Sequence, residues 1–327
     1  MSALESQMPP VMRADVNGIE MVYYQAGPGK GVPIVLCHGF PELAFSWRHQ
    51  LKALGEAGYW VIAPDQRGYG LSSRPDAVTD YDMAHLTGDL VGLLDHLGVE
   101  KAIFCGHDWG GFVVWQLPLI HPGRVAGVIG LNTPFLPRAP MDPIALMRTR
   151  FGPDMYIVWF QTPGDPEAVL GADVEKTLRF FMRKPGGPAA APETAPDGGS
   201  TFAFKALLQQ WDASDVGNQL LTHEELAAFV ETFKTTGFGG GINWYRNFTR
   251  NWEASGGLPS RIDHLPCLMI TAERDAVLTP AMAEGMPSLI GDLEMHMVVG
   301  SGHWTQQEKP EDVNRLMLDW LDRRFPK

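Results

Sequence analysis

Residues 102–111 read AIFCGHDWGG, a short apolar run followed by an aspartate between glycines. The run has the length and composition of a buried strand, and the residues from Trp109 onward have the pattern of a helix. Glycine at positions 106 and 110 suits a tight strand-to-helix turn that leaves no room for side chains. Such a turn is a nucleophile elbow, which presents its central side chain at the end of a strand. We therefore expect the Asp108 side chain to be accessible to a substrate at this turn. The motif alone fits a helix-capping aspartate equally well.

On both sides of this stretch, short apolar runs alternate with longer amphipathic segments. A hairpin joined at Asn17-Gly18 precedes them. This order is typical of a parallel sheet with helices on both faces. The pattern predicts an α/β fold with a mostly parallel eight-stranded sheet, with strands at 11–16, 19–24, 33–37, 59–64, 102–106, 124–131, 267–271 and 293–299. The helices that we expect beside it lie near 45–57 and 82–97, from 109, from about 279, and near 308–325.

The alternation stops between about residues 137 and 252, where the segments look helical and no buried strand is evident. We interpret residues 1–136 and 253–327 as two parts of one core, and residues 137–252 as an inserted helical cap. Within the cap, residues 185–200 consist largely of proline, glycine and alanine, which cannot bury enough surface for a packed element. We expect a mobile loop there.

The composition excludes several classes of protein. Acidic residues outnumber basic ones 38 to 26, so the formal charge is −12, and no basic patch for nucleic acid is evident. The apolar runs are too short to span a membrane, and the first residues carry no secretion signal. The three cysteines lie singly in apolar runs, which predicts reduced, buried thiols and neither a disulfide nor a metal site. We expect a cytoplasmic protein without metal or cofactor.

An aspartate at the elbow indicates a particular substrate chemistry. A serine that attacked an sp3 carbon would form an ether, which water could not cleave. A carboxylate is ionised at neutral pH and forms an ester that water can hydrolyse. Asp108 therefore points to an epoxide or an alkyl halide.

Two further residues follow the later strands in the order that this architecture uses. Asp275 comes just after the strand at 267–271, and His303 lies in a glycine-flanked loop after the strand at 293–299. We expect His303 to act as a base that Asp275 orients. The backbone N–H groups of Phe40 and Trp109 would form the oxyanion hole, and we expect supporting roles for His38, Pro41 and His107.

The segments HGFPE (38–42), DQRGYG (65–70), GHDWGG (106–111), NWYR (243–246) and GHWTQ (302–306) together resemble the α/β-hydrolase-fold epoxide hydrolases of the soluble type. The resemblance spans nearly the whole chain. It implies conversion of an epoxide and water to a vicinal diol through an ester on Asp108. It also implies two cap tyrosines that bind and protonate the epoxide oxygen. Only Tyr156 and Tyr245 lie in the cap or after it, so they take these positions.

Four residues are predicted to contact the substrate: Phe40, Trp109, Met155 and Trp159. Their character favours apolar epoxides. The identity and handedness of the substrate stay open, as does the choice between lipid signalling, detoxification and catabolism. Exposed cap surface is compatible with a homodimer.

Two other functions compete with this interpretation. A haloalkane dehalogenase would use the same aspartate, but it needs halide donors, and Phe40 stands where an amide donor is common. A non-catalytic binding protein of the same fold would not need the set of Asp108, Asp275 and His303. An ester hydrolase is disfavoured because neither serine nor cysteine occupies the elbow.

Overall fold

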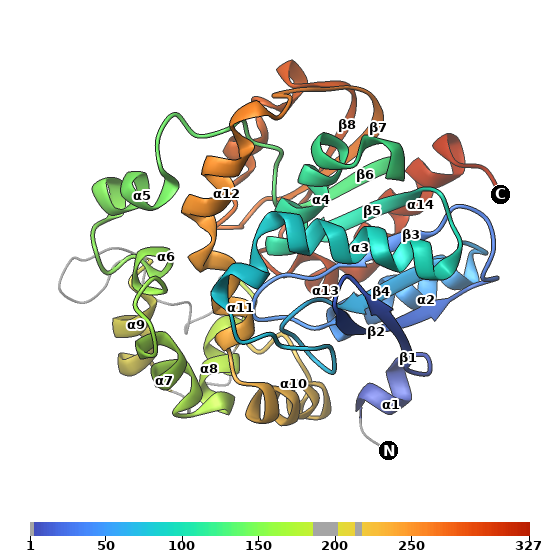
Figure 1. The fold of residues 1–327 in the computed structure, drawn as a ribbon. Coiled ribbons are helices and arrows are strands. Elements are labelled where there is room, and N and C mark those ends of the chain that lie inside the picture. The colour runs from blue at the N-terminus through green and yellow to red at the C-terminus, as the bar shows by residue number, and fades with distance from the viewer. Residues whose placement is uncertain (1–2, 186–201, 213–217) are drawn as a thin grey trace.

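The computed structural model describes residues 3–185, 202–212 and 218–327, and its centre is an eight-stranded sheet (Figure 1). The strand order is β1-β2-β4-β3-β5-β6-β7-β8. β2 is antiparallel to both β1 and β4, and the remaining neighbours are parallel. This confirms the predicted α/β fold and its mostly parallel sheet. The strands are β1 Met12–Val16, β2 Ile19–Ala26, β3 Ile34–Cys37, β4 Val61–Asp65, β5 Ala102–His107, β6 Val125–Leu131, β7 Ile262–Ala272 and β8 Ile290–Val298.

The predicted hairpin joins β1 and β2. Asn17 and Gly18 have φ values of 45° and 80°, as a two-residue turn with both central residues left-handed requires. Val16 pairs with Ile19, so the turn sets the register of the whole hairpin. The antiparallel edge of the sheet therefore follows from local sequence.

Helices cover both faces of the sheet (Figure 1). α3 (Met83–Leu97) and α4 (Trp109–Ile120) contact each other, and α4 packs on β5 and β6. α2 (Arg48–Glu56) and α14 (Pro310–Arg324) also contact each other and pack on other strands. β3, β4 and β5 are buried along their whole length, because helices shield both of their sides. Two short helices complete the core, α1 (Ala3–Gln7) and α13 (Thr305–Glu308).

Helices fill the insertion between β6 and β7 and lie together beside the sheet (Figure 1). The last of them ends at Ala254, two residues beyond the predicted boundary at 252. The boundaries of the cap stay a prediction, and residues 186–200 of the expected mobile loop lie outside the described residues. The cap helices are α5 Pro143–Phe151, α6 Tyr156–Trp159, α7 Asp165–Gly171, α8 Val174–Phe181, α9 Phe204–Gln210, α10 His223–Thr236, α11 Gly239–Arg246 and α12 Phe248–Ala254.

One predicted helix is wrong. Instead of an α-helix from about residue 279, the chain forms two 3₁₀ turns, Pro280–Ala283 and Met286–Ser288. Pro287 has no N–H to donate, and Gly285 is a poor helix former, so the apolar pattern is not continued as a helix.

Candidate active site

Asp108 lies at the sharp turn between β5 and α4, with a φ of 51°. A Cβ atom on Gly106 would lie 2.2 Å from the carbonyl oxygen of Gly110. A Cβ atom on Gly110 would lie 2.0 Å from the carbonyl oxygen of Cys37. Both neighbours are backbone atoms that cannot move aside, so only glycine fits at these two positions. The turn thus places the Asp108 side chain at the carboxyl end of the central strands.

The two carboxylate oxygens of Asp108 have different surroundings. Oδ1 accepts a hydrogen bond from the backbone N–H of Phe40 at 2.8 Å. Oδ2 lies 3.8 Å from Nε2 of His303. Burial raises the pKa of Asp108 above its ordinary value, while the charge of His303 and the N–H groups of Phe40 and Trp109 oppose this shift. One oxygen is therefore held by the Phe40 N–H group, and the other faces the histidine ring.

His303 is oriented by Asp275. Nδ1 of His303 lies 2.9 Å from Oδ2 of Asp275, and Oδ1 of Asp275 accepts the backbone N–H groups of Val277 and Leu278 at 2.8 and 3.0 Å. Burial alone would lower the pKa of His303, but the charges of Asp275 and Asp108 outweigh burial and raise it to about 9. Burial would raise the pKa of Asp275, yet His303 and the hydrogen bonds hold it well below its usual range. At neutral pH the ring of His303 is therefore protonated between two carboxylates.

A buried contact between Glu42 and His107 supports this arrangement. Oε2 of Glu42 accepts the N–H of Gly39 at 2.9 Å and lies 2.8 Å from Nδ1 of His107. Nε2 of His107 lies 2.7 Å from the carbonyl oxygen of His303. Both ring nitrogens of His107 thus face oxygen atoms. Burial would raise the pKa of Glu42, but His107 and Gly39 lower it below its ordinary value. Glu42 therefore links the loop that carries Phe40 to the loop that carries His303.

His38 and Pro41 lie in the same loop as Phe40. Nε2 of His38 accepts the N–H of Gln66 at 3.1 Å, so Nδ1 carries the proton and donates to the carbonyl oxygen of Gly39 at 3.0 Å. Burial lowers the pKa of His38, which agrees with a neutral ring. The Phe40–Pro41 peptide bond is cis. Both residues shape the loop that presents the Phe40 N–H group.

Two buried phenols lie on the cap side of Asp108. The rings of Tyr156 and Tyr245 are 5.8 Å apart, and Tyr245 lies edge-on to Trp109 at 5.1 Å. Burial raises the pKa of both phenols, and the charge of Asp108 raises it further. Tyr156 also stacks on Phe204 at 4.4 Å. Both tyrosines are therefore neutral hydrogen-bond donors within electrostatic reach of the carboxylate.

The two helices that carry the phenols are joined directly. Gln161, just after α6, donates from its amide to the carbonyl oxygen of Tyr245 at 3.1 Å. Arg246 of α11 donates to the carbonyl oxygen of Phe160 at 3.0 Å. These reciprocal bonds hold the two tyrosines at a fixed separation.

The site is assembled from three sections of the chain. Asp108 lies before the cap insertion, the phenols of Tyr156 and Tyr245 lie within it, and Asp275 and His303 follow it. The fold brings the carboxyl ends of β5, β7 and β8 together at one edge of the sheet. Of the residues predicted to contact substrate, Phe40 lies edge-on to Tyr245 at 5.4 Å, and Trp109 adjoins the same ring.

The contacts described for Trp159 and Met155 lie within and around α6. The indole of Trp159 donates to Asp165 and packs on Phe160, and Asp165 is partly exposed. Met155 is buried, and its sulfur accepts the N–H of Ile157 at the start of α6. Contact of either residue with substrate stays a prediction.

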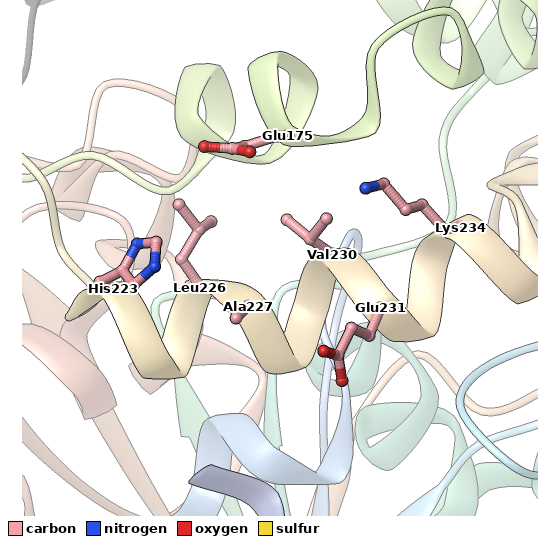
Figure 2. A pocket seen from close by; sticks show the side chains of 7 residues that line it. All are labelled: Glu175, His223, Leu226, Ala227, Val230, Glu231 and Lys234. Atoms are coloured by element: carbon pink, nitrogen blue, oxygen red, sulfur yellow. The ribbon is translucent and has the colours of Figure 1, made fainter. Parts of the chain in front are cut away.

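A separate hollow lies on a solvent-facing part of the cap, between α8 and α10 (Figure 2). Leu226 and Val230 of α10 point toward α8, with charged side chains around them. The hollow contains none of the predicted site residues; it is lined by Glu175, His223, Leu226, Ala227, Val230, Glu231 and Lys234.

Two residues of the site were not predicted from the sequence. Asn132 donates to Oδ2 of Asp275 at 2.6 Å and to the carbonyl oxygen of His303 at 3.1 Å. The signal available in the sequence was its position directly after β6, because the carboxyl ends of neighbouring parallel strands lie close together. Glu42 was part of a quoted motif, but its role depends on contacts with residues more than 60 positions away.

Two kinds of feature are absent from the described parts of the chain. No group of three or more histidine, cysteine or acidic side chains there is arranged to hold a metal ion. None of the helices in those parts is both long and apolar enough to cross a bilayer.

Comparisons with known proteins agree on one family. Residues 32–310 match the family described as alpha/beta hydrolase fold. Epoxide hydrolase A of Mycobacterium tuberculosis is 43% identical over 322 residues, which cover 96% of this chain and 97% of that protein. Bifunctional epoxide hydrolase 2 of Sus scrofa is 39% identical over 93% of this chain, which spans 54% of that longer protein. The crystal structure of epoxide hydrolase A from Mycobacterium thermoresistibile superposes with a TM-score of 0.87 at 41% identity, covering 96% of this chain and 98% of that one.

Proposed function

The chain belongs to the epoxide hydrolases of the α/β-hydrolase fold, and from that membership we propose that it forms vicinal diols through a covalent ester on Asp108. The observation that carries the proposal is the asymmetry of this carboxylate. Oδ1 is held by the Phe40 N–H group, which leaves Oδ2 to attack on the side where His303 and the phenols lie. A carboxylate held in this way needs no base to become a nucleophile.

In the first step, Oδ2 of Asp108 attacks one ring carbon of the epoxide from behind. The bond between that carbon and the epoxide oxygen breaks, and its electron pair stays on the oxygen. Tyr156 and Tyr245 hold the oxygen by hydrogen bonds, and one of them donates its proton. The protonated ring of His303 returns a proton to the phenolate. The products of this step are a hydroxyalkyl ester, two neutral phenols and a neutral imidazole.

In the second step, His303 acts as the base. Ester formation removes the charge of Asp108, which is one of the causes that hold the pKa of His303 at about 9. The neutral ring then takes one proton from water, and the hydroxide attacks Cγ of the ester. The N–H groups of Phe40 and Trp109 stabilise the negative Oδ1. The diol oxygen leaves with the second proton of the water, and Asp108 and protonated His303 are restored.

An isotope experiment tests the ester. Because water attacks Cγ, the bond between Cγ and Oδ2 breaks, and the new oxygen of the diol comes from Asp108. A single turnover with excess enzyme in ¹⁸O water should therefore give unlabelled diol and a labelled Asp108 peptide by mass spectrometry. Label in the diol after the first turnover would show direct attack by water and would contradict the proposal.

Two variants separate the steps. Asp108→Ala should abolish diol formation, because no nucleophile is left. His303→Gln should let the ester accumulate, detected as an increase in protein mass equal to one substrate molecule. Full steady-state turnover by His303→Gln would contradict the role of His303 as the base.

The aromatic side chains of Phe40 and Trp109 beside the carboxylate support apolar epoxides as the substrate class. A panel of aryl and alkyl epoxides, with haloalkanes as controls, tests this choice. Halide release without diol formation would favour a dehalogenase. A homodimer and a cytoplasmic location stay predictions from the sequence.

A further inference from the structure

Arg48 forms a buried ion pair between the core and the cap. It is the first residue of α2, and its Nε donates to Oε1 of Glu225 at 2.9 Å. The two side chains are 4% and 10% exposed. Glu225 also closes the capping box of α10, where its other oxygen accepts the N–H of Thr222 at 2.9 Å. The guanidinium group therefore fixes the start of a cap helix to the core.

The same guanidinium group holds α13, the short helix that follows the His303 loop. Nη1 of Arg48 donates to Oε1 of Gln307 at 2.7 Å. With its oxygen turned to Arg48, the Gln307 amide presents its NH₂ group to Oε1 of Glu42, at 3.4 Å. The neighbouring Gln306 donates to the same oxygen at 2.9 Å. Arg48 thus determines which way the Gln307 amide faces, and so helps to hold the Glu42 carboxylate.

Glu42 is the point where this network reaches the reacting groups. Its other oxygen accepts the N–H of Gly39, next to the Phe40 donor, and pairs with His107, which contacts the His303 carbonyl group. The buried Arg48 faces Glu225, and the buried Glu42 faces His107. A buried network of this kind is rigid only when every member is paired.

We propose that Arg48 is a positioning residue for ester hydrolysis, which fixes Glu42 and α13, and through them the Phe40 and His303 loops, to cap helix α10. The proposal rests on the two-step function above. It predicts a larger effect on the second step than on the first, because ester hydrolysis needs both loops in register. Ring opening uses these loops only through the Phe40 N–H group on Oδ1 and the proton of His303. Ester hydrolysis also needs His303 to activate water beside Cγ and the Phe40 N–H group to hold the negative Oδ1.

The test is Arg48→Lys, which keeps the charge but replaces the fixed fork of guanidinium donors, in which Nε faces Glu225 and Nη1 faces Gln307, by a single ammonium nitrogen. Single-turnover mass measurements give both rates, with excess enzyme and a styrene-type epoxide as the probe. We expect ester formation within about threefold of the original enzyme and ester hydrolysis slowed by about tenfold or more, as small misplacements of reacting groups cause. Gln307→Leu leaves the ion pair intact and should slow ester hydrolysis in the same way.

Arg67→Lys is the matched control. Arg67 is equally buried and donates to both oxygens of Asp89 at 2.6 and 2.7 Å, but this pair does not reach Glu42. This variant should not slow ester hydrolysis more than ester formation. Equal slowing of both steps by Arg48→Lys, or no slowing of hydrolysis in either test variant, would overturn the proposal. If the original enzyme itself formed no ester, the proposed function would fail and this inference with it.

Discussion

At the scale of single residues, the two cap phenols are predicted to share the developing charge of the epoxide oxygen. Tyr156→Phe or Tyr245→Phe should each lower the rate of ester formation by about ten- to a hundredfold, and the double variant should lower it further. The measurement is single-turnover kinetics. Tyr59→Phe is the control, because its hydroxyl group donates to Asp322 on α14. Equal rates in the single and double variants would mean that only one phenol acts.

The pKa of His303 should depend on the charges of both neighbouring carboxylates. Asp275 raises it more than Asp108 does, and together they bring it to about 9. In NMR titrations of the ring, Asp108→Asn should lower this pKa, and Asp275→Asn should lower it more. Mass measurement of Asp108→Asn confirms that the amide is intact. An unchanged or higher pKa in Asp108→Asn would contradict the electrostatic account of the second step.

The raised pKa also predicts how stability depends on pH. His303 has an ordinary pKa of 6.5 and a folded-state pKa of about 9, so its protonation stabilises the fold fully below pH 6.5. That contribution is lost as the pH rises through 9. In urea unfolding, the gap in free energy between the original protein and His303→Gln should therefore be larger at pH 6 than at pH 10. A difference in the free energy of unfolding that grew with pH would contradict this prediction.

Sequence motifs predicted the positions of Asp108, Asp275 and His303, because each follows a strand whose apolar run is easy to find. They did not predict Asn132 or the role of Glu42. The contacts of these side chains depend on how β6 and the Phe40 loop approach residues far away in the chain. Local patterns carry no information about such distances.

At the scale of elements, the elbow between β5 and α4 should tolerate no side chain at Gly106. In Gly106→Ala, the new methyl group would meet the Gly110 carbonyl oxygen. We expect the free energy of unfolding to fall by about 2 kcal/mol or more, with loss of activity. Gly123→Ala is the control, since nothing lies within 4 Å of its added methyl group. Chemical denaturation of both variants is the measurement.

The central strands β3, β4 and β5 were predictable because they are buried on both faces and therefore read as continuous apolar runs. β1 and β2 were predictable from their hairpin turn. The helix expected from about 279 failed because proline and glycine outweigh an apolar pattern there. The four-residue helix α13 was also missed as a separate element, since one turn has no periodicity to detect. Its placement depends on tertiary contacts.

At the scale of the whole molecule, Trp244 joins the cap to the core. Its indole N–H donates to the carbonyl oxygen of Arg67 at 3.1 Å, and the side chain is fully buried. Trp244→Phe should cost about 1 to 3 kcal/mol by leaving that carbonyl group unpaired. Hydrogen exchange should speed up in α10 and α11 and stay unchanged in β5 and β6.

Trp252→Phe is the matched control for this prediction. It removes a bond of the same kind, to the carbonyl oxygen of Ala139, which does not join cap to core. If hydrogen exchange in α10 and α11 also became faster in Trp252→Phe, the effect of Trp244→Phe would not come from the contact between cap and core.

The three-part origin of the site bears on how the protein is made. A ribosome adds Asp108 first, then the cap with its phenols, and only much later Asp275 and His303. A nascent chain that has not reached residue 303 carries Asp108 and both phenols but lacks the residue proposed as the base. On the proposed mechanism, diol production in a synchronised translation reaction therefore begins only when chains have been synthesised past residue 303 and have folded.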